Sequence, residues 1–222
     1  MILLALSTSG KAACAALIKD GVLISQALRD EGRTHSETVM PLAAALLAEQ
    51  GFSPMDVDAF AADVGPGSFT GVRIGVCAAN AMAAVKGVPV IGVSSLAALA
   101  EPFMGEEQAV CAVLDARNGN GYAALYENGS CTVAPSAVVF AEFLPTLPEN
   151  TLFVGDAAII QRKRIEETVP GARFAPDEAH LLTAAPVARE AWQLLQRGET
   201  ASEVMPLYLR PTQAERLYKE KK

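Results

Sequence analysis

The segment 63–75 contains the residues of this chain whose types and spacing most directly suggest chemistry. It follows the apolar run 57–62, which predicts a buried strand, and it leads into the small-residue run 72–85, which predicts a helix. Gly65 and Gly67 form a tight turn between the two, and the backbone N–H groups of such a turn can bind phosphate. A glycine-rich turn alone is a weak signal, so Gly65 and Gly67 are candidate phosphate ligands only together with other groups.

Other polar side chains could complete such a site. Ser9 and Lys11 lie in a predicted turn after the first strand, where backbone N–H groups and an ammonium group could hold a phosphate. An ordinary β-turn explains the same residues. Asp115 ends a later predicted strand and forms either an ion pair with Arg117 or a group that faces a cleft. Asp156 could contact a ligand or cap the helix that follows it.

The composition indicates a folded cytoplasmic protein. The 222 residues include 51% hydrophobic and 19% charged residues, which suits an ample core in one large domain or two small ones. The four cysteines are scattered through mostly apolar runs, which indicates reduced core residues rather than disulfides or a metal cluster. We expect no membrane span, because no uncharged apolar stretch reaches about 18 residues.

The charge of the chain limits its partners. The formal net charge is −7, from 18 basic and 25 acidic residues. Nucleic-acid binders usually carry a basic surface, so another subunit should supply most of any RNA contact. The exception is the basic C-terminal tail, which is either a solvated, frayed end or an RNA contact. Its basic residues are Arg216, Lys219, Lys221 and Lys222.

The predicted elements fall into two halves with one pattern. The first half predicts strands at 2–7, 12–19 and 22–29, a helix at 36–49, a strand at 57–62, the small-residue helix, a strand at 88–93 and a short helix from residue 94. The second half predicts strands at 109–114, 121–126 and near 131–133, a helix near 137–144, a strand at 151–154, a helix near 157–168 and a helix at about 184–196.

Three strands followed by alternating helices and strands, twice over, are typical of the α/β fold of actin-like ATPases and sugar kinases, which is ribonuclease H-like. The expected lobes are 1–102 and 108–222, each with a mixed sheet flanked by helices, on either side of a nucleotide cleft. In that fold an acidic residue at the end of the first strand helps to organise Mg²⁺. Ser7 takes this position here, and its hydroxyl group offers the cation no negative charge.

The segment 63–75 closely resembles the signature of the bacterial TsaB (YeaZ) family, which is related to the TsaD family. Similar motifs at 88–96, 115–117 and 206–210 extend the resemblance over nearly the whole chain. The resemblance implies a non-catalytic subunit required for threonylcarbamoylation of the adenosine next to the anticodon in tRNAs that read ANN codons. It also implies the TsaD transferase as dimerisation partner, the P-loop ATPase TsaE as a further partner, and tRNA met only through the complex. A homodimer is a further expectation for the isolated chain.

The two helices at 36–49 and 70–85 indicate where a partner would dock. Both are crowded with small and apolar residues, and a helix that is apolar all round must be buried on both sides. One side can cover its own sheet, and the other is covered either by a partner or by the same domain. The candidate interface residues are His35, Val39, Leu42, Ala43, Leu46, Gly71, Gly75, Ala78, Ala79 and Met82.

The sequence contains few signals for the binding of a cofactor or a metal. No cofactor is certain, and the candidates are weak ATP or ADP binding, or a nucleotide held only in the complex. The related TsaD family carries two metal-binding histidines at the positions of Ser95 and Leu99, and a leucine cannot bind a metal. The chain has only two histidines, His35 and His180, far apart in sequence, so we expect no metal.

Two other function classes stay open. A small-molecule kinase or ATPase of the same fold would need an acidic Mg²⁺ site, which Ser7 does not provide. A degenerate glycopeptidase-like metalloprotease would need metal ligands, which Ser95 and Leu99 do not provide.

Overall fold

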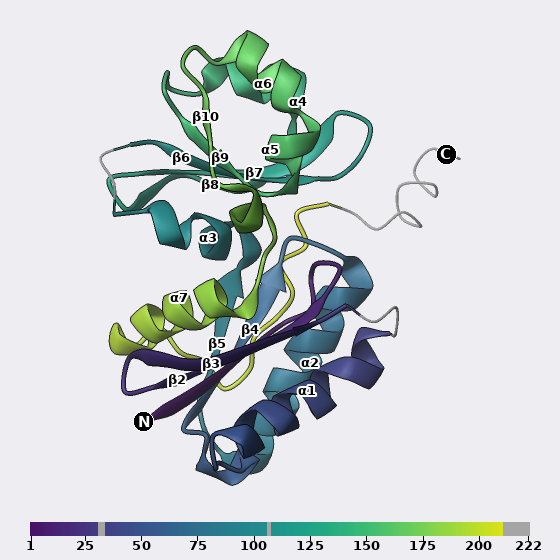
Figure 1. The fold of residues 1–222 in the computed structure, drawn as a ribbon, viewed down its shortest axis with the longest axis vertical. Coiled ribbons are helices and arrows are strands. Elements are labelled where there is room, and N and C mark those ends of the chain that lie inside the picture. Colours follow the sequence, from purple (N-terminus) through teal and green to yellow (C-terminus); the bar gives the residue numbers. More distant parts are fainter. Residues whose placement is uncertain (31–33, 106–107, 211–222) are drawn as a thin grey trace.

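The computed structural model of this chain describes residues 1–30, 34–105 and 108–210. These residues form two lobes, one above the other in Figure 1, and each lobe is built around a five-stranded sheet. The strand order is β3-β2-β1-β4-β5 in the first sheet and β10-β9-β6-β7-β8 in the second. In both sheets the first three strands along the chain pair antiparallel and the last two join in parallel. This repeated topology confirms the predicted pair of mixed sheets.

The elements of the first half lie close to their predicted ranges. They are β1 (Ile2–Ser7), β2 (Ala13–Lys19), β3 (Val22–Arg29), α1 (His35–Glu49), the 3-10 turn η1 (Pro54–Asp56), β4 (Ala59–Gly65), α2 (Phe69–Lys86), β5 (Val90–Ser94), α3 (Ser95–Ala100) and η2 (Glu101–Phe103). The hairpin between β2 and β3 turns at Asp20 and Gly21, which both have positive φ, 51° and 84°. This is the two-residue turn that matches the twist of paired strands.

The elements of the second half repeat this order with shorter helices. They are β6 (Val110–Asp115), β7 (Asn120–Glu127), β8 (Ser130–Val139), α4 (Phe140–Phe143), η3 (Leu144–Thr146), β9 (Leu152–Val154), α5 (Asp156–Ile160), α6 (Arg162–Thr168), β10 (Arg173–Phe174), η4 (Asp177–His180) and α7 (Ala184–Gln196).

Two predicted helices of the second half differ from the structure. The helix expected near 137–144 is only α4, because β8 continues to Val139 and pairs with β7 as far as Asn120. The β-branched pair Val138 and Val139 favours this extension of the strand. The helix expected near 157–168 is interrupted at Gln161, which separates α5 from α6.

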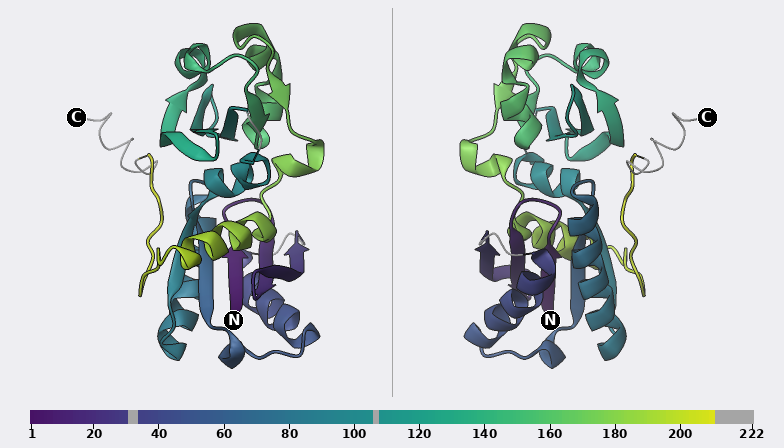
Figure 2. Two further views of the ribbon diagram at one scale, coloured as in Figure 1. Left: turned by 90° about the vertical axis from the view of Figure 1, so that its left-hand side faces the viewer. Right: turned by 90° about the vertical axis from the view of Figure 1, so that its right-hand side faces the viewer.

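Helices cover both faces of the first sheet (Figure 2). α1 and α2 lie side by side on one face, where they bury Leu4 and Leu6 of β1. α7 lies on the opposite face, over Leu3 and Ala5 of the same strand. Because both faces are covered, every residue of β1 is buried, which explains its nearly continuous apolar sequence.

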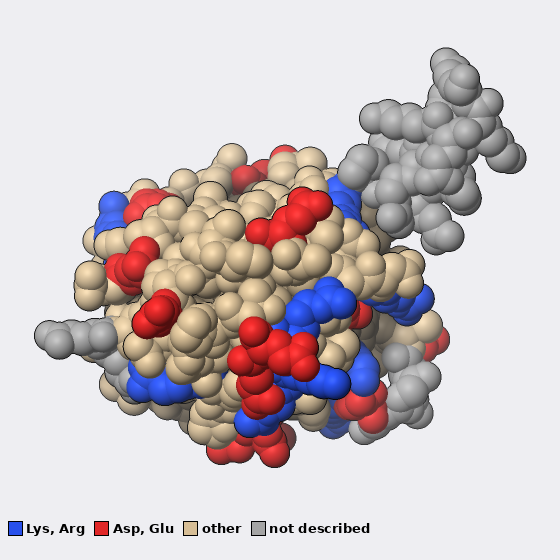
Figure 3. Space-filling view, turned by 90° about the horizontal axis from the view of Figure 1, so that it is seen from above, with Lys and Arg blue, Asp and Glu red and all other residues tan. Residues whose placement is uncertain are grey.

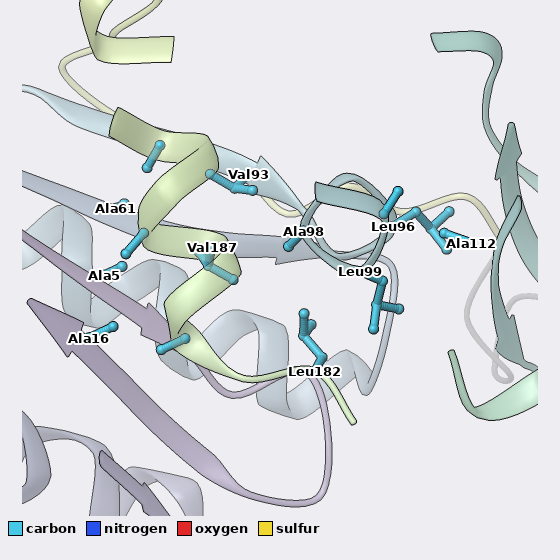
Figure 4. Close-up of a cluster of buried hydrophobic side chains, with 14 of the residues drawn as sticks. Ala5, Ala16, Ala61, Val93, Leu96, Ala98, Leu99, Ala112, Leu182 and Val187 are labelled. Carbon is cyan, nitrogen blue, oxygen red and sulfur yellow. The ribbon is translucent and has the colours of Figure 1, made fainter. Parts of the chain in front are cut away.

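The position of α7 corrects a prediction. The sequence pattern placed this helix with the second lobe, in the range 108–222, but its contacts are mainly with β1, β2 and β5 of the first sheet. Figure 4 shows Val187 of α7 above Ala5 and Ala16. The small alanine side chains let the helix approach the sheet closely, and they offer it an apolar surface that matches its own.

One buried cluster continues from the first lobe into the second. Leu96 and Leu99 of α3 lie between the sheets, and Ala112 of β6 contacts the same cluster from the second lobe (Figure 4). α3 therefore links the two lobes through apolar contacts, in addition to the chain connection that precedes β6. Among the described residues, no helix is long and apolar enough to cross a membrane.

Candidate functional site

A buried carboxylate lies where the parallel strands of the first sheet end. Asp63 of β4 is 1% exposed. Its Oδ2 accepts hydrogen bonds from the hydroxyl groups of Ser7, at 2.9 Å, and Ser9. Its Oδ1 accepts one from Ser95 Oγ at 2.5 Å and one from the Gly65 N–H at 2.9 Å. Asp63 thus joins the ends of β1 and β4 to the first residue of α3.

Two opposing effects act on the protonation of Asp63. Desolvation in the fully buried site raises the pKa of the carboxyl group, and the four hydrogen bonds it accepts oppose that rise. The net direction is upward, so burial outweighs the hydrogen bonds. Sequence reasoning quoted Asp63 only as the first residue of the glycine segment. The sequence signal that could have revealed this site was a run of small hydroxyl-bearing residues at the ends of neighbouring strands.

The glycines of segment 63–75 pack against the first turn of the same chain. A Cβ atom at Gly71 would lie 1.9 Å from the Thr8 carbonyl oxygen, and one at Gly75 would lie 2.6 Å from Thr8 Oγ1. A Cβ atom at Gly67 would lie 2.7 Å from Ser9 Cβ. The smooth side of α2 therefore faces β1 and its turn, and the glycines are needed for this internal contact.

The predicted phosphate ligands of the first lobe come together, but as an internal contact. Ser9 is 6% exposed, its hydroxyl donates to Asp63, and its carbonyl oxygen accepts from the Ser68 N–H. Gly67 packs against Ser9, and the Gly65 N–H donates to Asp63. The Ser9 hydroxyl is thus already used, and Lys11, which is exposed, is the polar side chain that this turn leaves open to solvent.

Acidic residues of the second lobe lie opposite Lys11. The backbone N–H of Asp115 donates to Asp156 Oδ1 at 2.9 Å, and Asp115 Oδ2 accepts from the backbone N–H of Arg117 at 3.1 Å. Asp115 therefore bonds the Arg117 backbone, and the described residues show no ion pair between Asp115 and the Arg117 guanidinium group. Partial desolvation and the nearby Asp115 carboxylate raise the pKa of Asp156, while the Lys11 ammonium group opposes the rise. The nucleotide site stays a prediction.

The interface residues named from the sequence are mostly internal. Seven of them are buried within this chain: Val39, Leu42, Ala43, Leu46, Gly71, Gly75 and Ala79. His35, Ala78 and Met82 are half-buried, and His35 Nε2 lies 3.0 Å from the Gly10 carbonyl oxygen. The prediction selected the sides of the helices that face their own sheet, because those sides contain the most regular apolar spacing.

The solvent-facing sides of α1 and α2 are nevertheless uncommonly apolar. The exposed residues of the two helices include charged ones nearer their ends, Glu37 and Glu49 of α1 and Arg73 of α2. We call the exposed apolar residues between them the α1/α2 face. They are Met40, Pro41, Ala44 and Ala48 of α1 and Cys77, Ala81, Ala84 and Val85 of α2. Val85 is 84% exposed and Met40 is 43% exposed. Such a surface, formed by small side chains without charge, suits close packing of another protein's helices.

A second exposed group lies at the start of α2. Phe69 and Tyr208 stack with their ring centres 5.0 Å apart. The Arg73 Nε–H donates to the Tyr208 hydroxyl oxygen at 2.7 Å, and the Arg73 guanidinium carbon lies 4.3 Å from the centre of the Phe69 ring. We call these three residues the aromatic–arginine cluster. Sequence reasoning did not find it, because Tyr208 is 135 residues from Arg73.

The two positions compared with metal-binding histidines have other roles. Ser95 Oγ donates to Asp63, and Leu99 is 3% exposed in the cluster between the lobes. His180 is buried, and its Nδ1 accepts from the Gly155 N–H at 3.2 Å. Within residues 1–30, 34–105 and 108–210, no three His, Cys, Asp or Glu side chains gather as metal ligands would.

Comparisons with known proteins agree with the fold and the sequence motifs. Residues 25–218 match the family model for TsaD, tRNA N6-adenosine threonylcarbamoyltransferase. The tRNA threonylcarbamoyladenosine biosynthesis protein TsaB of Bacillus subtilis is 32% identical over 176 residues, which cover 76% of this chain and 77% of that protein.

Solved structures give the same result. YeaZ from Pseudomonas aeruginosa superimposes with a TM-score of 0.78 at 30% identity, covering 94% of this chain and 99% of that one. The ROK hexokinase of Thermus thermophilus reaches a TM-score of 0.50 at 12% identity, covering 88% and 100%, which shows a shared sugar-kinase fold and no more. With the matched family model, the identity to TsaB and the YeaZ-like structure, this chain belongs to the TsaB (YeaZ) family, which is related to TsaD.

Proposed function

We propose that this chain is a non-catalytic subunit of the machinery that makes threonylcarbamoyladenosine in tRNA. In this role it pairs with a TsaD-type transferase and activates it, and the transferase modifies the adenosine next to the anticodon. The names of its TsaB relatives support the pathway, and the matched TsaD family model supports a partner of related fold.

The observation that carries the pairing is the α1/α2 face. It presents Ala, Met, Pro, Cys and Val side chains to solvent, whereas the opposite side of the same sheet is covered by α7. A partner with the same fold could place its own helix pair on this face, so that each subunit contributes the same type of surface. When the transferase is absent, two copies of this chain would pair through the same face and form a homodimer.

The hydrogen bonds made by its polar groups support the proposal that this chain is not itself catalytic. Ser7 and Ser9 donate their hydroxyl groups to the buried Asp63, and Asp115 accepts from the backbone beside it. The hydroxyl protons of Ser7 and Ser9 are thus engaged inside the chain rather than directed to a bound substrate. A P-loop ATPase of the TsaE type is the further partner in this proposal, and nucleotide is bound weakly or only in the complex.

The test places a charge in the α1/α2 face. Ala81→Glu and Ala44→Glu place a good helix former at an exposed position, so the melting temperature of each variant should be close to that of the wild type. In the complex the new carboxylate would be buried, and its desolvation would oppose docking. The matched control is Val22→Glu, at a position that is 63% exposed on β3. Co-elution with the TsaD-type transferase should be lost for both alanine variants and kept for the control. Normal co-elution of Ala81→Glu and Ala44→Glu would contradict the assigned surface.

A further inference from the structure

The last segment that the structure describes, residues 201–210, has a defined place on the first lobe. We call it the C-terminal strap. Ala201 pairs with Val90 of β5, and the Asn80 side chain of α2 bonds both the N–H and the carbonyl oxygen of Val204, at 3.0 and 2.9 Å. These bonds hold the strap, drawn in yellow in Figure 2, beside α2.

The strap continues the α1/α2 face on the side of α2 that is turned away from α1 (Figure 2). Arg73 is exposed, and it precedes Cys77 of the α1/α2 face by about one helical turn. The Arg73 Nε–H donates to the Tyr208 hydroxyl oxygen of the strap. Met205 of the strap is 72% exposed and adds a further apolar side chain. A protein that covers the α1/α2 face is therefore within reach of the aromatic–arginine cluster.

The aromatic–arginine cluster is held together by its own contacts and is still open to solvent. Phe69 is 41% exposed and Tyr208 is 47% exposed, although they stack on each other. The Arg73 guanidinium carbon lies 4.3 Å from the centre of the Phe69 ring and 5.8 Å from that of the Tyr208 ring. Because these side chains are already ordered, a partner that binds them pays little for ordering them. Tyr and Arg side chains are typical anchors of protein interfaces.

The positive charge of Arg73 has no acidic counterpart in the described part of the chain. Arg73 bonds a neutral hydroxyl group, and none of the ion pairs among the described residues includes it. The other cation of the strap, Arg210, lies elsewhere, with its guanidinium carbon 6.0 Å from the centre of the Tyr122 ring in β7. The terminal N–H groups of the Arg73 guanidinium group can therefore bond a carboxylate from outside the chain.

Arg162 of α6 shows, in the same chain, the contact that Arg73 lacks. Its guanidinium carbon lies 4.3 Å from the centre of the Phe174 ring, and its Nε–H also donates to Glu166. Figure 3 shows the upper surface of the second lobe, where Lys and Arg side chains lie among Asp and Glu side chains. An arginine stacked on a ring is thus completed by a carboxylate on the second lobe, and Arg73 is the same arrangement without one.

A protein segment fits this surface better than a nucleic acid does. RNA binding relies on several cations that neutralise phosphates, and this chain has a formal net charge of −7. The aromatic–arginine cluster offers one cation, which suits one carboxylate. The α1/α2 face beside it is apolar, as the buried centre of a protein interface is.

We propose that the α1/α2 face and the aromatic–arginine cluster form one docking surface, on which the protein partner places a carboxylate against Arg73 and an apolar side chain over Phe69 and Tyr208. This inference rests on the proposed function, and it adds the chemistry by which the partner, a TsaD-type transferase, is recognised. The apolar face supplies contact area, and the ion pair at its edge fixes the orientation of the partner.

The experiment measures the Kd of the full chain for the purified TsaD-type transferase by isothermal titration calorimetry. Arg73→Gln should weaken binding by about 10-fold or more, because a charge-assisted hydrogen bond to the partner is lost. Arg73→Glu should weaken binding further, since two carboxylates then face each other. Arg73→Lys keeps the charge but not the planar fork, so its Kd should lie between those of the wild type and Arg73→Gln.

The matched control is Arg162→Gln, which removes the exposed, ring-stacked arginine of the second lobe and should leave the Kd unchanged. The affinity of the wild type should fall as salt is added, and that of Arg73→Gln should fall less, because salt screens the proposed ion pair. Tyr208→Ala should weaken binding, whereas Tyr208→Phe keeps the ring and should bind nearly as the wild type does. The Tm of Arg73→Gln should be close to that of the wild type, because the side chain is exposed.

Three results would overturn the inference and leave the proposed function standing. The first is an equal Kd for the wild type, Arg73→Gln and Arg73→Glu, while Ala81→Glu still loses binding. The second is equal weakening by Arg73→Gln and Arg73→Glu with unchanged salt dependence, which would limit Arg73 to holding the strap. The third is an unchanged transferase Kd of Arg73→Gln with weaker binding of fluorescent, unmodified tRNA, which would make the cluster an RNA contact. Absence of transferase binding by the wild type would contradict the proposed function and this inference together.

Discussion

Ser95 Oγ donates a 2.5 Å hydrogen bond to the buried carboxylate of Asp63, and this bond ties the first residue of α3 to the end of β4. The same carboxylate accepts from Ser7 and Ser9 at the end of β1. Three segments that meet at the edge of the first sheet are thus held by one side chain. Because α3 also packs against β6, the site lies on the connection between the lobes.

The Asp63 site predicts an unusual pH dependence of stability. In the folded chain the Asp63 pKa lies above its unfolded value of about 3.9, so the folded state binds more protons between the two values. The free energy of unfolding should therefore fall as pH rises through that window. Asp63→Asn cannot ionise, so the stability advantage of the wild type over this variant should be largest in acid and shrink as pH rises.

Urea unfolding of both proteins between about pH 3.5 and 7 checks this prediction. Exposed Asp20 and Asp56 have lowered pKa values, through hydrogen bonds with the N-terminus and with Ser53, and they favour stability at higher pH. They are present in both proteins and cancel in the difference. If the difference in unfolding free energy between the wild type and Asp63→Asn widened as pH rose, the hydrogen bonds to Asp63 would outweigh its desolvation.

Gly75→Leu should destabilise the chain itself. The new side chain would meet Thr8 Oγ1, which lies 2.6 Å from the position of a Cβ atom, so β1 and α2 would have to move apart. Such overpacking typically costs about 1–3 kcal/mol, and each kcal/mol lowers Tm by about 2–4 °C in a chain of this size.

The matched control for Gly75→Leu is Ala81→Leu, on the exposed side of the same helix. Its Tm should be close to that of the wild type, while its co-elution with the transferase should fall. If Gly75→Leu melts normally and only assembly is lost, the glycine faces a partner and not Thr8.

The purified chain should contain no stoichiometric transition metal. Ser95 is bonded to Asp63, Leu99 is buried, and His180 Nδ1 accepts a backbone hydrogen bond. Elemental analysis after dialysis is the measurement. One zinc or iron per chain would reopen the hydrolase hypothesis.

The sequence predicted the fold well where local patterns decide it. The strands on either side of the hairpin turns at Asp20–Gly21 and Asn128–Gly129 were predicted, and these turns contain Asp, Asn and Gly with positive φ, which such residues adopt more readily than others. The bounds of α7 were predicted correctly, but the helix was assigned to the wrong lobe. A helix pattern in the sequence does not say which of two sheets the helix covers.

The site was less predictable, for a related reason. The spacing of Gly71 and Gly75 shows that they share a side of α2, but only the structure shows Thr8 against them. The contacts of Asp63 with Ser9 and of Arg73 with Tyr208 join residues 54 and 135 positions apart. Such long-range pairs leave no periodic pattern in a single sequence, so they could not be predicted from spacing.

The most direct test of the proposed function is reconstituted tRNA modification. Unmodified tRNA, the threonylcarbamoyl donor, the TsaD-type transferase and the TsaE-type ATPase are mixed with and without this chain, and threonylcarbamoyladenosine is measured by mass spectrometry. We predict product only when the chain is present, none with the chain alone, and a large loss with Ala81→Glu but not with Val22→Glu. Product formed by this chain without the transferase, or equal product whether or not the chain is added, would contradict the proposed role.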